Sequence, residues 1–577
     1  MPNRAGQFVG EQTEADGGQT TVAGYLLRRL QDLGIGHLFG VPGDYLLGFL
    51  DRVPSSGLQF VATCNELDAA YASDGYARIR GAGALCTTYG VGELSALNGV
   101  AGAFAEGVPV VVITGAPARD SFRTGSLLHH TLGDYEIPQR MYASITAASV
   151  RLESAETAPT EIDRALQACM ARRLPVYISL PADVVALPCR RPGAWLPAAP
   201  DDGDAAALRE AVSDALGLLR HARRPLALAG VGLIRTGLQE GFAAFLKRTG
   251  MPYATMMLGK SVLSERHPQF LGLYEGSHSE RALVERVRTA DCVLEFGTLL
   301  SDLNTGGFTL DTGAAPVIRS SLAWVDIGGR RYDRVPLRAF LAALALQAPA
   351  FPQADLDISQ AGGNMPHSPD REYRAEPDRE LTVRRFFDRM AHFLKRDSIV
   401  LADVGVSLYG AAETLLPDGA TFVGQAFYGS IGYTVGAALG AGMASPKRPL
   451  VLFVGDGAFQ MACQELSTIV RNRLDATVFL LNNDGYSIER MIDDRPYDDL
   501  QPWGYHRLAE AFGCRHALDV RTEGGLEDAL ATAAKEAGLV FIEVHTGRLD
   551  GPESVLGAGR AMAKANRLSS PTQGAAC

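Results

Sequence analysis

Continuous apolar runs alternate with helix-like stretches along almost the whole chain, and this alternation limits the fold more than any other feature. Examples of the runs are VPVVVITG at 108–115, PVYISL at 175–180 and LVLFV at 450–454. Apolar runs without polar alternation are typical of parallel strands that helices cover on both faces. Helix-like segments such as LDAAYASDGYAR at 67–78 lie between them. The pattern predicts an α/β fold with parallel sheets.

Two stretches without periodicity divide the chain of 577 residues into three parts. Residues 190–207 are rich in Pro, Ala and Asp, and residues 348–378 are rich in Pro, Gly, Asp and Gln. Such compositions are typical of linkers, and a chain of this length is expected to form several domains. We expect three Rossmann-like domains over residues 20–192, 205–347 and 379–567, with residues 348–378 as a linker.

Composition argues against some classes of function. The net charge of −11 disfavours a nucleic-acid partner, which would favour a basic surface. The 8 cysteines are scattered without metal-type spacing, as in reduced intracellular proteins. The first nineteen residues lack the apolar core of a signal peptide, and no apolar stretch approaches the ~20 residues of a membrane helix. We expect a cytoplasmic protein that does not enter a membrane.

The sequence VLFVGDGAF at 451–459 carries the sharpest chemical signal. An apolar strand ends in Gly455, Asp456 and Gly457, and a helix is expected over 460–471, so that backbone N–H groups would point at a phosphate. Asn483 and Gly485 follow the next predicted strand. The Asp456 carboxylate, the Asn483 side chain and the Gly485 carbonyl would together bind Mg²⁺ beside that phosphate. The alternative is that both segments are ordinary turns between strands and helices.

This pair of motifs resembles the diphosphate-binding motif of thiamine-dependent enzymes. Further segments look like the pyruvate, indolepyruvate and phenylpyruvate decarboxylase family of thiamine-diphosphate-dependent 2-keto acid decarboxylases: HLFGVPGDY at 37–45, CNELDAAYASDGYAR at 64–78, TTYGVGELSALNGVAGAFAE at 87–106, LLHHTLGD at 127–134, GQAFYGSIGYTVGAALG at 424–440 and NNDGYSIERMI at 482–492. The resemblance implies a pyrimidine-binding, a central and a diphosphate-binding domain, in that order. It also implies non-oxidative decarboxylation of a 2-keto acid to an aldehyde and CO₂ through the ylide of thiamine diphosphate, with Mg²⁺.

The resemblance assigns roles to single residues. Glu66 would bond N1′ of the aminopyrimidine, Gly429 would accept the 4′-amino group, and Ile431 would hold the cofactor bent. The catalytic set would supply an acid and a base near neutrality, and it comprises Glu66, Asp44, His129, His130 and Glu489. The cofactor-binding residues that it implies are Glu66, Gly429, Ile431, Gly455, Asp456, Gly457, Ala458, Asn483 and Ile488.

The substrate pocket is expected to be wide. Family members specific for pyruvate place aromatic residues at positions resembling Leu303 and Leu408, and smaller walls leave room for a larger apolar side chain. Ile488 and Ile492 would line the same pocket. We expect phenylpyruvate, indolepyruvate or a branched-chain 2-keto acid as the substrate, with pyruvate as the alternative.

The resemblance also implies an assembly. Glu66 and the diphosphate-binding motif would come from different subunits, so that a homodimer is the minimal active unit and a homotetramer is the expected form. A helix-like run at 552–567 would close over the site, as the terminal helix does in the family.

Three other functions remain open at this point. A carboligase similar to acetolactate synthase shares the cofactor motifs but usually binds FAD and lacks the pair His129 and His130. A nicotinamide-dependent oxidoreductase would use Gly230 and Gly232 after the run PLALA, although Arg235 stands where the third glycine of that motif belongs. A binding protein with a vestigial thiamine fold is the third, and the complete catalytic set argues against it.

Overall fold

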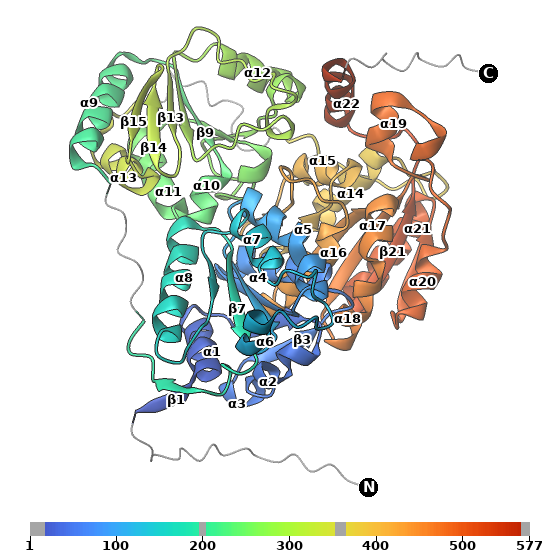
Figure 1. The fold of residues 1–577 in the computed structure, drawn as a ribbon. Coiled ribbons are helices and arrows are strands. Elements are labelled where there is room, and N and C mark those ends of the chain that lie inside the picture. Colours follow the sequence, from blue (N-terminus) through green and yellow to red (C-terminus); the bar gives the residue numbers. More distant parts are fainter. Residues whose placement is uncertain (1–17, 196–202, 352–364, 567–577) are drawn as a thin grey trace.

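The computed structural model describes residues 18–195, 203–351 and 365–566 (Figure 1). Three α/β domains follow one another along the chain, each built on one large sheet with helices on its faces. The predicted α/β class is confirmed. The two predicted linkers fall partly outside the described residues, at 196–202 and 352–364.

The N-terminal sheet has six parallel strands in the order β3-β2-β4-β5-β7-β6. β5 is buried at every position, because its Val-rich run has no polar face. The strands are β2 His37–Gly40, β3 Gln59–Ala62, β4 Gly83–Thr88, β5 Val110–Ala116, β6 Ser149–Arg151 and β7 Val176–Pro181. The helices are α1 Val22–Asp32, α2 Leu47–Leu50, α3 Val53–Ser56, α4 Glu66–Arg80, α5 Val91–Ala105, α6 Arg119–Thr124, α7 Ile137–Ala143 and α8 Ala158–Arg172. A small antiparallel pair, β1 (Gln19–Thr21) and β8 (Pro188–Arg190), joins the two ends of the domain.

The central sheet has seven strands in the order β11-β10-β9-β12-β13-β14-β15. The first five are parallel, and β14 pairs antiparallel with both β13 and β15, so this sheet is mixed. The strands are β9 Pro225–Ala229, β10 Tyr253–Thr255, β11 Phe270–Leu273, β12 Cys292–Phe296, β13 Val317–Ser320, β14 Trp324–Ile327 and β15 Arg330–Asp333. The helices are α9 Ala205–His221, α10 Val231–Arg235, α11 Gln239–Thr249, α12 Arg281–Arg288 and α13 Leu337–Gln347.

The turn after β9 leaves no room for a dinucleotide phosphate. A Cβ atom on Gly230 would lie 2.2 Å from the carbonyl oxygen of Gly297, so backbone already covers the turn. Gly232 packs on the same Gly297. These glycines serve close packing between two loops of the central domain, which removes the structural basis for a nicotinamide site here.

The C-terminal sheet has six parallel strands in the order β17-β16-β18-β19-β21-β20. The strands are β16 Ile399–Ala402, β17 Thr421–Val423, β18 Leu450–Gly455, β19 Ala476–Asn482, β20 His516–Val520 and β21 Leu539–His545. The helices are α14 Val383–Phe393, α15 Val406–Ala412, α16 Tyr433–Ala444, α17 Asp456–Ala462, α18 Leu466–Arg471, α19 Ser487–Asp493, α20 Tyr505–Ala511, α21 Glu523–Lys535 and α22 Glu553–Ala565. In Figure 1, α22 lies beside α19 at one end of this domain.

Helices α4 and α16 join the N-terminal and C-terminal domains of one chain. Both helices are rich in Ala and Gly, and their backbones approach closely as a result. A Cβ atom on Gly75 would lie 2.3 Å from the carbonyl oxygen of Ala437, and one on Gly440 would lie 1.8 Å from that of Ala72. Only glycine fits at these two contacts, so the sequence of α4 and α16 sets the distance between the two domains.

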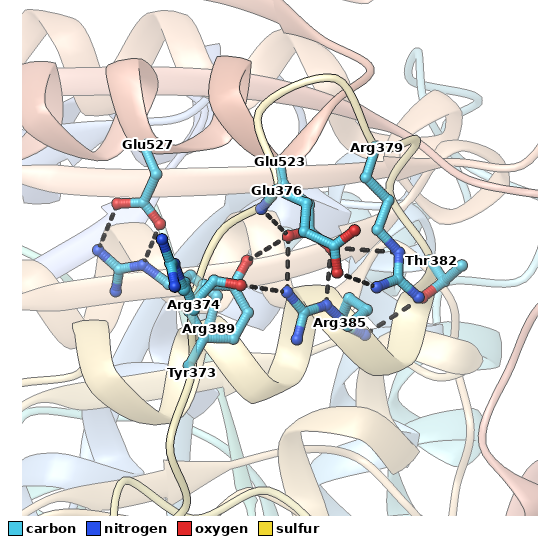
Figure 2. A network of polar contacts seen from close by, with 9 residues as sticks. All are labelled: Tyr373, Arg374, Glu376, Arg379, Thr382, Arg385, Arg389, Glu523 and Glu527. Atoms are coloured by element: carbon cyan, nitrogen blue, oxygen red, sulfur yellow. Dashed lines mark hydrogen bonds and ion pairs between the residues drawn. The ribbon is translucent and has the colours of Figure 1, made fainter.

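An ion-pair network fastens the segment before α14 to the start of α21 (Figure 2). Glu523, whose side chain is fully buried, accepts hydrogen bonds from Arg385 at 2.7 and 2.6 Å. The backbone N–H of Glu376 donates to the same carboxylate at 2.9 Å. Residues 365–378 of the predicted second linker are therefore bound to the C-terminal domain, whereas the backbone of Phe351 donates to Thr249 of the central domain.

Among the described residues, no helix combines the length and the apolar character that crossing a membrane requires.

Candidate active site

The predicted phosphate and metal motifs meet at the carboxyl end of the C-terminal sheet. β18 and β19 are parallel neighbours, so the loops that follow them lie side by side. Oδ1 of Asp456 accepts from the N–H of Gly457 at 2.8 Å, and Oδ2 accepts from the N–H of Gly485 at 2.9 Å. The helix predicted over 460–471 instead begins at Asp456 as α17 and is interrupted by a 3₁₀ turn at Cys463–Glu465. Helix geometry thus starts inside the motif, since Asp456 follows directly on the strand.

Three oxygen atoms converge beside these loops. Oδ1 of Asn483 lies 2.9 Å from the carbonyl oxygen of Gly485 and 3.3 Å from Oδ1 of Asp456. The amide would gain hydrogen bonds by turning over, because in this orientation an oxygen faces only other oxygens. A cation between the three would remove that conflict, and neighbouring oxygens around octahedral Mg²⁺ lie about 2.9 Å apart. The donor set therefore fits the predicted metal.

Burial raises the pKa of Asp456 to about 7, and the hydrogen bonds from Gly457 and Gly485 only partly oppose this effect. A carboxylate in such surroundings is costly without a compensating positive charge. A cation bound beside Asp456 would therefore stabilise the charged form of its carboxylate.

Arg490 binds the backbone of residues 483–485, the loop after β19 that is named the metal loop below. This arginine is almost completely buried, and it donates to the carbonyl oxygens of Asn483 at 3.0 Å and of Asp484. Its guanidinium also pairs with Asp499 at 2.8 Å. Two carbonyl groups of the loop are bound in this way, and the carbonyl oxygen of Gly485 lies 2.9 Å from the Asn483 side chain.

A cavity of about 290 Å³ opens in front of this loop. One wall is polar and includes the predicted phosphate and metal residues, together with Glu489. The other wall is apolar and includes Leu303 from the central domain and Met562 from α22. The predicted residues that line the cavity are Leu303, Gly429, Ile431, Gly455, Asp456, Gly457, Ala458, Asn483, Gly485, Ile488, Glu489 and Ile492.

Leu408 does not line this cavity. It is fully buried in the core, and its Cδ1 atom packs on Gly424, where an added Cβ would lie 2.8 Å away. The part of α15 and its preceding loop that faces the cavity is residues 404–407. The sequence could not decide between these faces, since every residue of α15 is buried.

The loop that carries Gly429 and Ile431 is held by one buried acid. Asp403 accepts from the N–H of Gly432 at 3.2 Å and from the N–H of Thr434 at 3.0 Å. Burial raises the pKa of Asp403 to about 6, although these hydrogen bonds favour its charged form. Gly429 has a φ of 70°, in the left-handed region that glycine tolerates.

The other predicted catalytic residues form a second group in the N-terminal domain. Nε2 of His129 lies 2.7 Å from Oδ2 of Asp44, and the ring of Tyr45 stacks on His129 with 5.0 Å between centroids. His130 meets His129 edge to face at 4.5 Å and has a φ of 69°, which is strained for a residue with a Cβ. Both side chains of the Asp44 and His129 pair are about half exposed, at 48% and 59%.

Glu66 is the first residue of α4, one position before the helix-like segment predicted at 67–78. Asn65 caps the helix by accepting from the N–H of Asp68 at 2.8 Å, and the N-terminus of a helix favours an acid at the next position. Gly92 leaves space beside it, since a Cβ there would lie 3.0 Å from Oε1 of Glu66. Neither Glu66 nor the group around His129 lines the cavity in front of the metal loop.

Comparisons with known proteins decide the family. Models described as thiamine pyrophosphate enzyme match at residues 20–135 (N-terminal TPP binding domain), 212–348 (central domain) and 403–544 (C-terminal TPP binding domain). The chain is 40% identical over 547 residues to an alpha-keto-acid decarboxylase of Mycolicibacterium paratuberculosis, covering 92% of this chain and 95% of that protein. It is 36% identical over 560 residues to a pyruvate decarboxylase of Aspergillus fumigatus, covering 95% and 97%. This chain belongs to the thiamine-diphosphate-dependent 2-keto acid decarboxylases.

Membership in this decarboxylase family fits the polar wall of the cavity. Thiamine diphosphate, when bound, supplies the carbon nucleophile and the electron sink for loss of CO₂. Asp456, Asn483 and the Gly485 carbonyl would hold a cation, and the N–H groups at the start of α17 would face the diphosphate. The central domain matches a model of the same enzyme family, so the nicotinamide interpretation is wrong.

Several residues of the site were not predicted from the sequence. Tyr428 and Met562 line the cavity, and Ser487 lies 2.9 Å from the Asn483 amide. Arg490 supports the loop that follows β19. A signal existed for Arg490 alone, because it stands within the first turns of a helix that directly follows a metal loop and can reach back to it.

Proposed function

We propose that this decarboxylase acts, with Mg²⁺, on a 2-keto acid with a bulky aromatic or branched side chain, such as phenylpyruvate, indolepyruvate or a branched-chain 2-keto acid. The apolar wall of the cavity carries the proposal. Leu303, Ile488, Ile492 and Met562 face the cavity from three different segments, and no aromatic ring stands at Leu303. Pyruvate remains the alternative substrate.

Burial of the substrate side chain in this cavity favours a larger substrate. A larger substrate that buries a further ~100 Å² against this wall gains on the order of 2.5 kcal/mol over a methyl group, at 25 cal/mol per Å². Phe427, Tyr428 and Tyr486 also line the cavity. The flexible, unbranched side chain of Met562 lets the apolar wall adapt to ring and branched shapes. The pocket therefore favours bulk without fixing one shape.

Roles for the ionisable residues are part of this proposal. Glu489 lies in the cavity with the metal loop, where its carboxylate would face the reacting carbon of the substrate. His129, bound to Asp44 and next to His130, would move protons to and from the product. Glu66 would bond the pyrimidine ring of the cofactor.

We further propose that each active site contains residues of two chains. Within one chain, the cavity is lined by the C-terminal domain, the central domain and α22, whereas Glu66, Asp44, His129 and His130 do not reach it. A second chain would supply them, so a homodimer is the minimal active unit and a homotetramer the expected one. The seven described cysteines are unpaired, in keeping with a cytoplasmic location.

Substrate and cofactor are tested together. Release of aldehyde and CO₂ would be measured with pyruvate, 2-ketoisovalerate, phenylpyruvate and indolepyruvate, with and without thiamine diphosphate and Mg²⁺. Higher kcat/KM for the bulky acids supports the pocket argument, and a clear preference for pyruvate overturns it. Turnover that persists after removal of the metal by a chelator would overturn the role of Asp456 and Asn483.

The shared site is tested by complementation. Glu66→Ala chains and Asp456→Ala chains, each inactive alone, would be dissociated, mixed and reassociated. If the site spans two chains, half of the dimers are hybrids with one intact site, and about a quarter of the wild-type sites return. If each site lies within one chain, the mixture stays inactive.

A further inference from the structure

A group of histidines and carboxylates lies at the edge of the C-terminal sheet, outside the cavity. Glu543 and His545 stand two positions apart in β21, so their side chains project from the same face. Asp519 is the register partner of Glu543 on the edge strand β20. His506 comes from the first turn of α20, which packs on β20 and β21.

The donor atoms of this group are close together. Nδ1 of His506 lies 2.7 Å from Oε2 of Glu543, and the ligand atoms of His506, Asp519 and Glu543 all lie within 4.8 Å of one another. Nε2 of His545 lies 2.6 Å from Oδ1 of Asp519 and 3.5 Å from Oε1 of Glu543. This nitrogen is buried, and its contacts with the two carboxylates are close in distance but lack the angles of a hydrogen bond.

We propose that His506, Asp519 and Glu543 bind a divalent transition-metal ion such as Zn²⁺, and that His545 orients the Asp519 carboxylate. One imidazole and two carboxylates form a mixed donor set that suits Zn²⁺, whereas Mg²⁺ takes oxygen ligands. In a tetrahedral site with ligands at ~2.1 Å, neighbouring donor atoms lie about 3.4 Å apart. The contact between His506 and Glu543 therefore needs to open only slightly to admit the ion.

The surroundings of the three ligands resemble the outer ligand support of known metal sites. Oε1 of Glu543 accepts from Nδ2 of Asn482 at 2.8 Å, and Oε2 accepts from the backbone N–H of His506 at 3.0 Å. Glu543 is buried, while the side chains of His506 and Asp519 are 23% and 35% exposed. The exposed pair gives the ion a path from solvent.

The site is separate from the thiamine site but adjacent to it. Asn482, which binds Glu543, directly precedes the predicted Mg²⁺ ligand Asn483 and accepts from the N–H of Asp484 at 3.3 Å. A metal ion at Glu543 would stiffen the end of β19 from the side opposite the cavity. The second group with suitable spacing, Asp44, His129 and His130, belongs to the proposed catalytic set and serves as an internal comparison.

The test uses the full-length holoenzyme saturated with thiamine diphosphate and Mg²⁺, with Co²⁺ and Zn²⁺ as probes. Co²⁺ titration would be followed by visible absorption, Zn²⁺ by calorimetry, and metal content by elemental analysis after gel filtration. We expect one ion per chain, with an affinity that falls at least tenfold in Asp519→Asn and in His506→Ala. His545→Gln should weaken binding by about 10- to 100-fold.

Two controls separate this site from other metal binding. Asp528→Asn removes the same charge from an exposed position on α21 and should leave the titration unchanged. The double variant Asp44→Asn/His129→Gln disrupts the other cluster and should also keep the ion. Asp519→His retains a ligand and should bind Co²⁺ with an altered spectrum, which answers the objection that Asp519→Asn merely misfolds. Absence of stoichiometric binding, or loss in the double variant but not in Asp519→Asn, overturns the proposal.

Discussion

The backbone N–H of Gly485 donates to Oδ2 of Asp456 at 2.9 Å, although the two residues stand 29 positions apart in the chain. One carboxylate oxygen therefore fastens the loop after β19 to the loop after β18, while the other faces Asn483. The metal loop is held in shape by the protein itself, and a cation would find its ligands already in place.

Asp456→Asn should separate these two roles. The amide oxygen can still accept from Gly485, and the variant removes a charge whose burial is costly, so the cofactor-free protein should unfold at the same temperature or higher. Mg²⁺-dependent binding of thiamine diphosphate should fall by about a hundredfold or more, because a carboxylate ligand is lost. Calorimetric titration and thermal unfolding would measure the two effects.

Asp484→Asn is the matched control for this change. Asp484 lies in the same loop and carries the same charge, but its side chain is exposed and it does not line the cavity. Cofactor affinity should stay within a few-fold of wild type. Equal losses in both variants would mean that the charge of the loop, and not ligation by Asp456, governs binding.

Glu523→Gln should destabilise the C-terminal domain in a pH-dependent way (Figure 2). The hydrogen bonds and charge of Arg385 lower the pKa of Glu523 below its ordinary 4.5, despite burial. Because the pKa of Glu523 is lower in the folded than in the unfolded chain, its charged form stabilises the fold fully at pH values above the ordinary pKa. This stabilisation is lost as the pH falls through the lowered pKa of the folded state. The difference in free energy of unfolding between wild type and variant should be about 2–3 kcal/mol at pH 7.5 and should shrink below pH 4.

Glu527→Gln provides the comparison for Glu523. Its carboxylate also accepts two hydrogen bonds from one arginine, Arg389, at 2.6 and 3.0 Å, but it is 37% exposed. An exposed pair contributes less than ~1 kcal/mol. Urea unfolding at both pH values would compare the variants, and a loss at Glu527 as large as that at Glu523 would contradict the assignment to burial.

The sequence predicted the structure correctly where an apolar strand pattern is followed directly by residues typical of a phosphate or metal site. The run LVLFV followed by Gly-Asp-Gly predicted β18 and the phosphate loop, because an apolar strand that stops at a polar turn leaves few other structures. Asn483 was placed correctly beside Asp456, since successive parallel strands end at the same edge.

Other features depend on contacts between distant segments. Gly75 and Gly440 allow α4 and α16 to pack closely, which no local pattern in either helix shows. Leu408 lies on a helix that is buried all round, so no amphipathic pattern shows which face meets the cavity. The cluster around Glu543 joins His506 to Asp519 through sheet register, which no local spacing reveals.

Leu303→Trp should narrow the substrate range. Leu303 lies in a short 3₁₀ turn on the rim of the cavity, and the larger ring would fill space that a bulky substrate needs. The ratio of kcat/KM for phenylpyruvate to that for pyruvate should fall by about tenfold or more, as expected for 1–3 kcal/mol of steric conflict. Leu303→Ala should shift the ratio the other way.

Leu408→Met tests the same argument from the opposite side. Met has nearly the same volume as Leu, and Leu408 lies in the core beside Gly424. The free energy of unfolding should therefore change by less than ~1.5 kcal/mol. The ratio of kcat/KM for phenylpyruvate to that for pyruvate should not change. A shift of selectivity in this variant, with none in Leu303→Trp, would return Leu408 to the pocket and remove Leu303 from it.

The C-terminal helix α22 should matter for turnover more than for cofactor binding. Met562 contributes to the apolar wall, and Gly559 packs against Met491 of α19, where an added Cβ would lie 2.9 Å from the Met491 Cβ. Ser554 donates to Glu413, which fixes the start of the helix to the C-terminal domain. None of these contacts involves the metal loop. A chain ending at Gly551 should therefore keep thiamine diphosphate affinity within a few-fold, while kcat/KM for a bulky acid falls by about a hundredfold as water enters the site.

A chain ending at Asn566 is the matched control, because it keeps α22 and all of these contacts. It should retain wild-type turnover and affinity. Met562→Ala, which leaves the helix in place and opens only the wall, should raise KM for bulky substrates more than it lowers kcat, since it removes apolar contact made in the ground state and the transition state alike. Unaffected turnover in the chain ending at Gly551 would show that the cavity excludes water without α22, and a parallel loss of cofactor affinity would show that the helix stabilises the diphosphate loops instead.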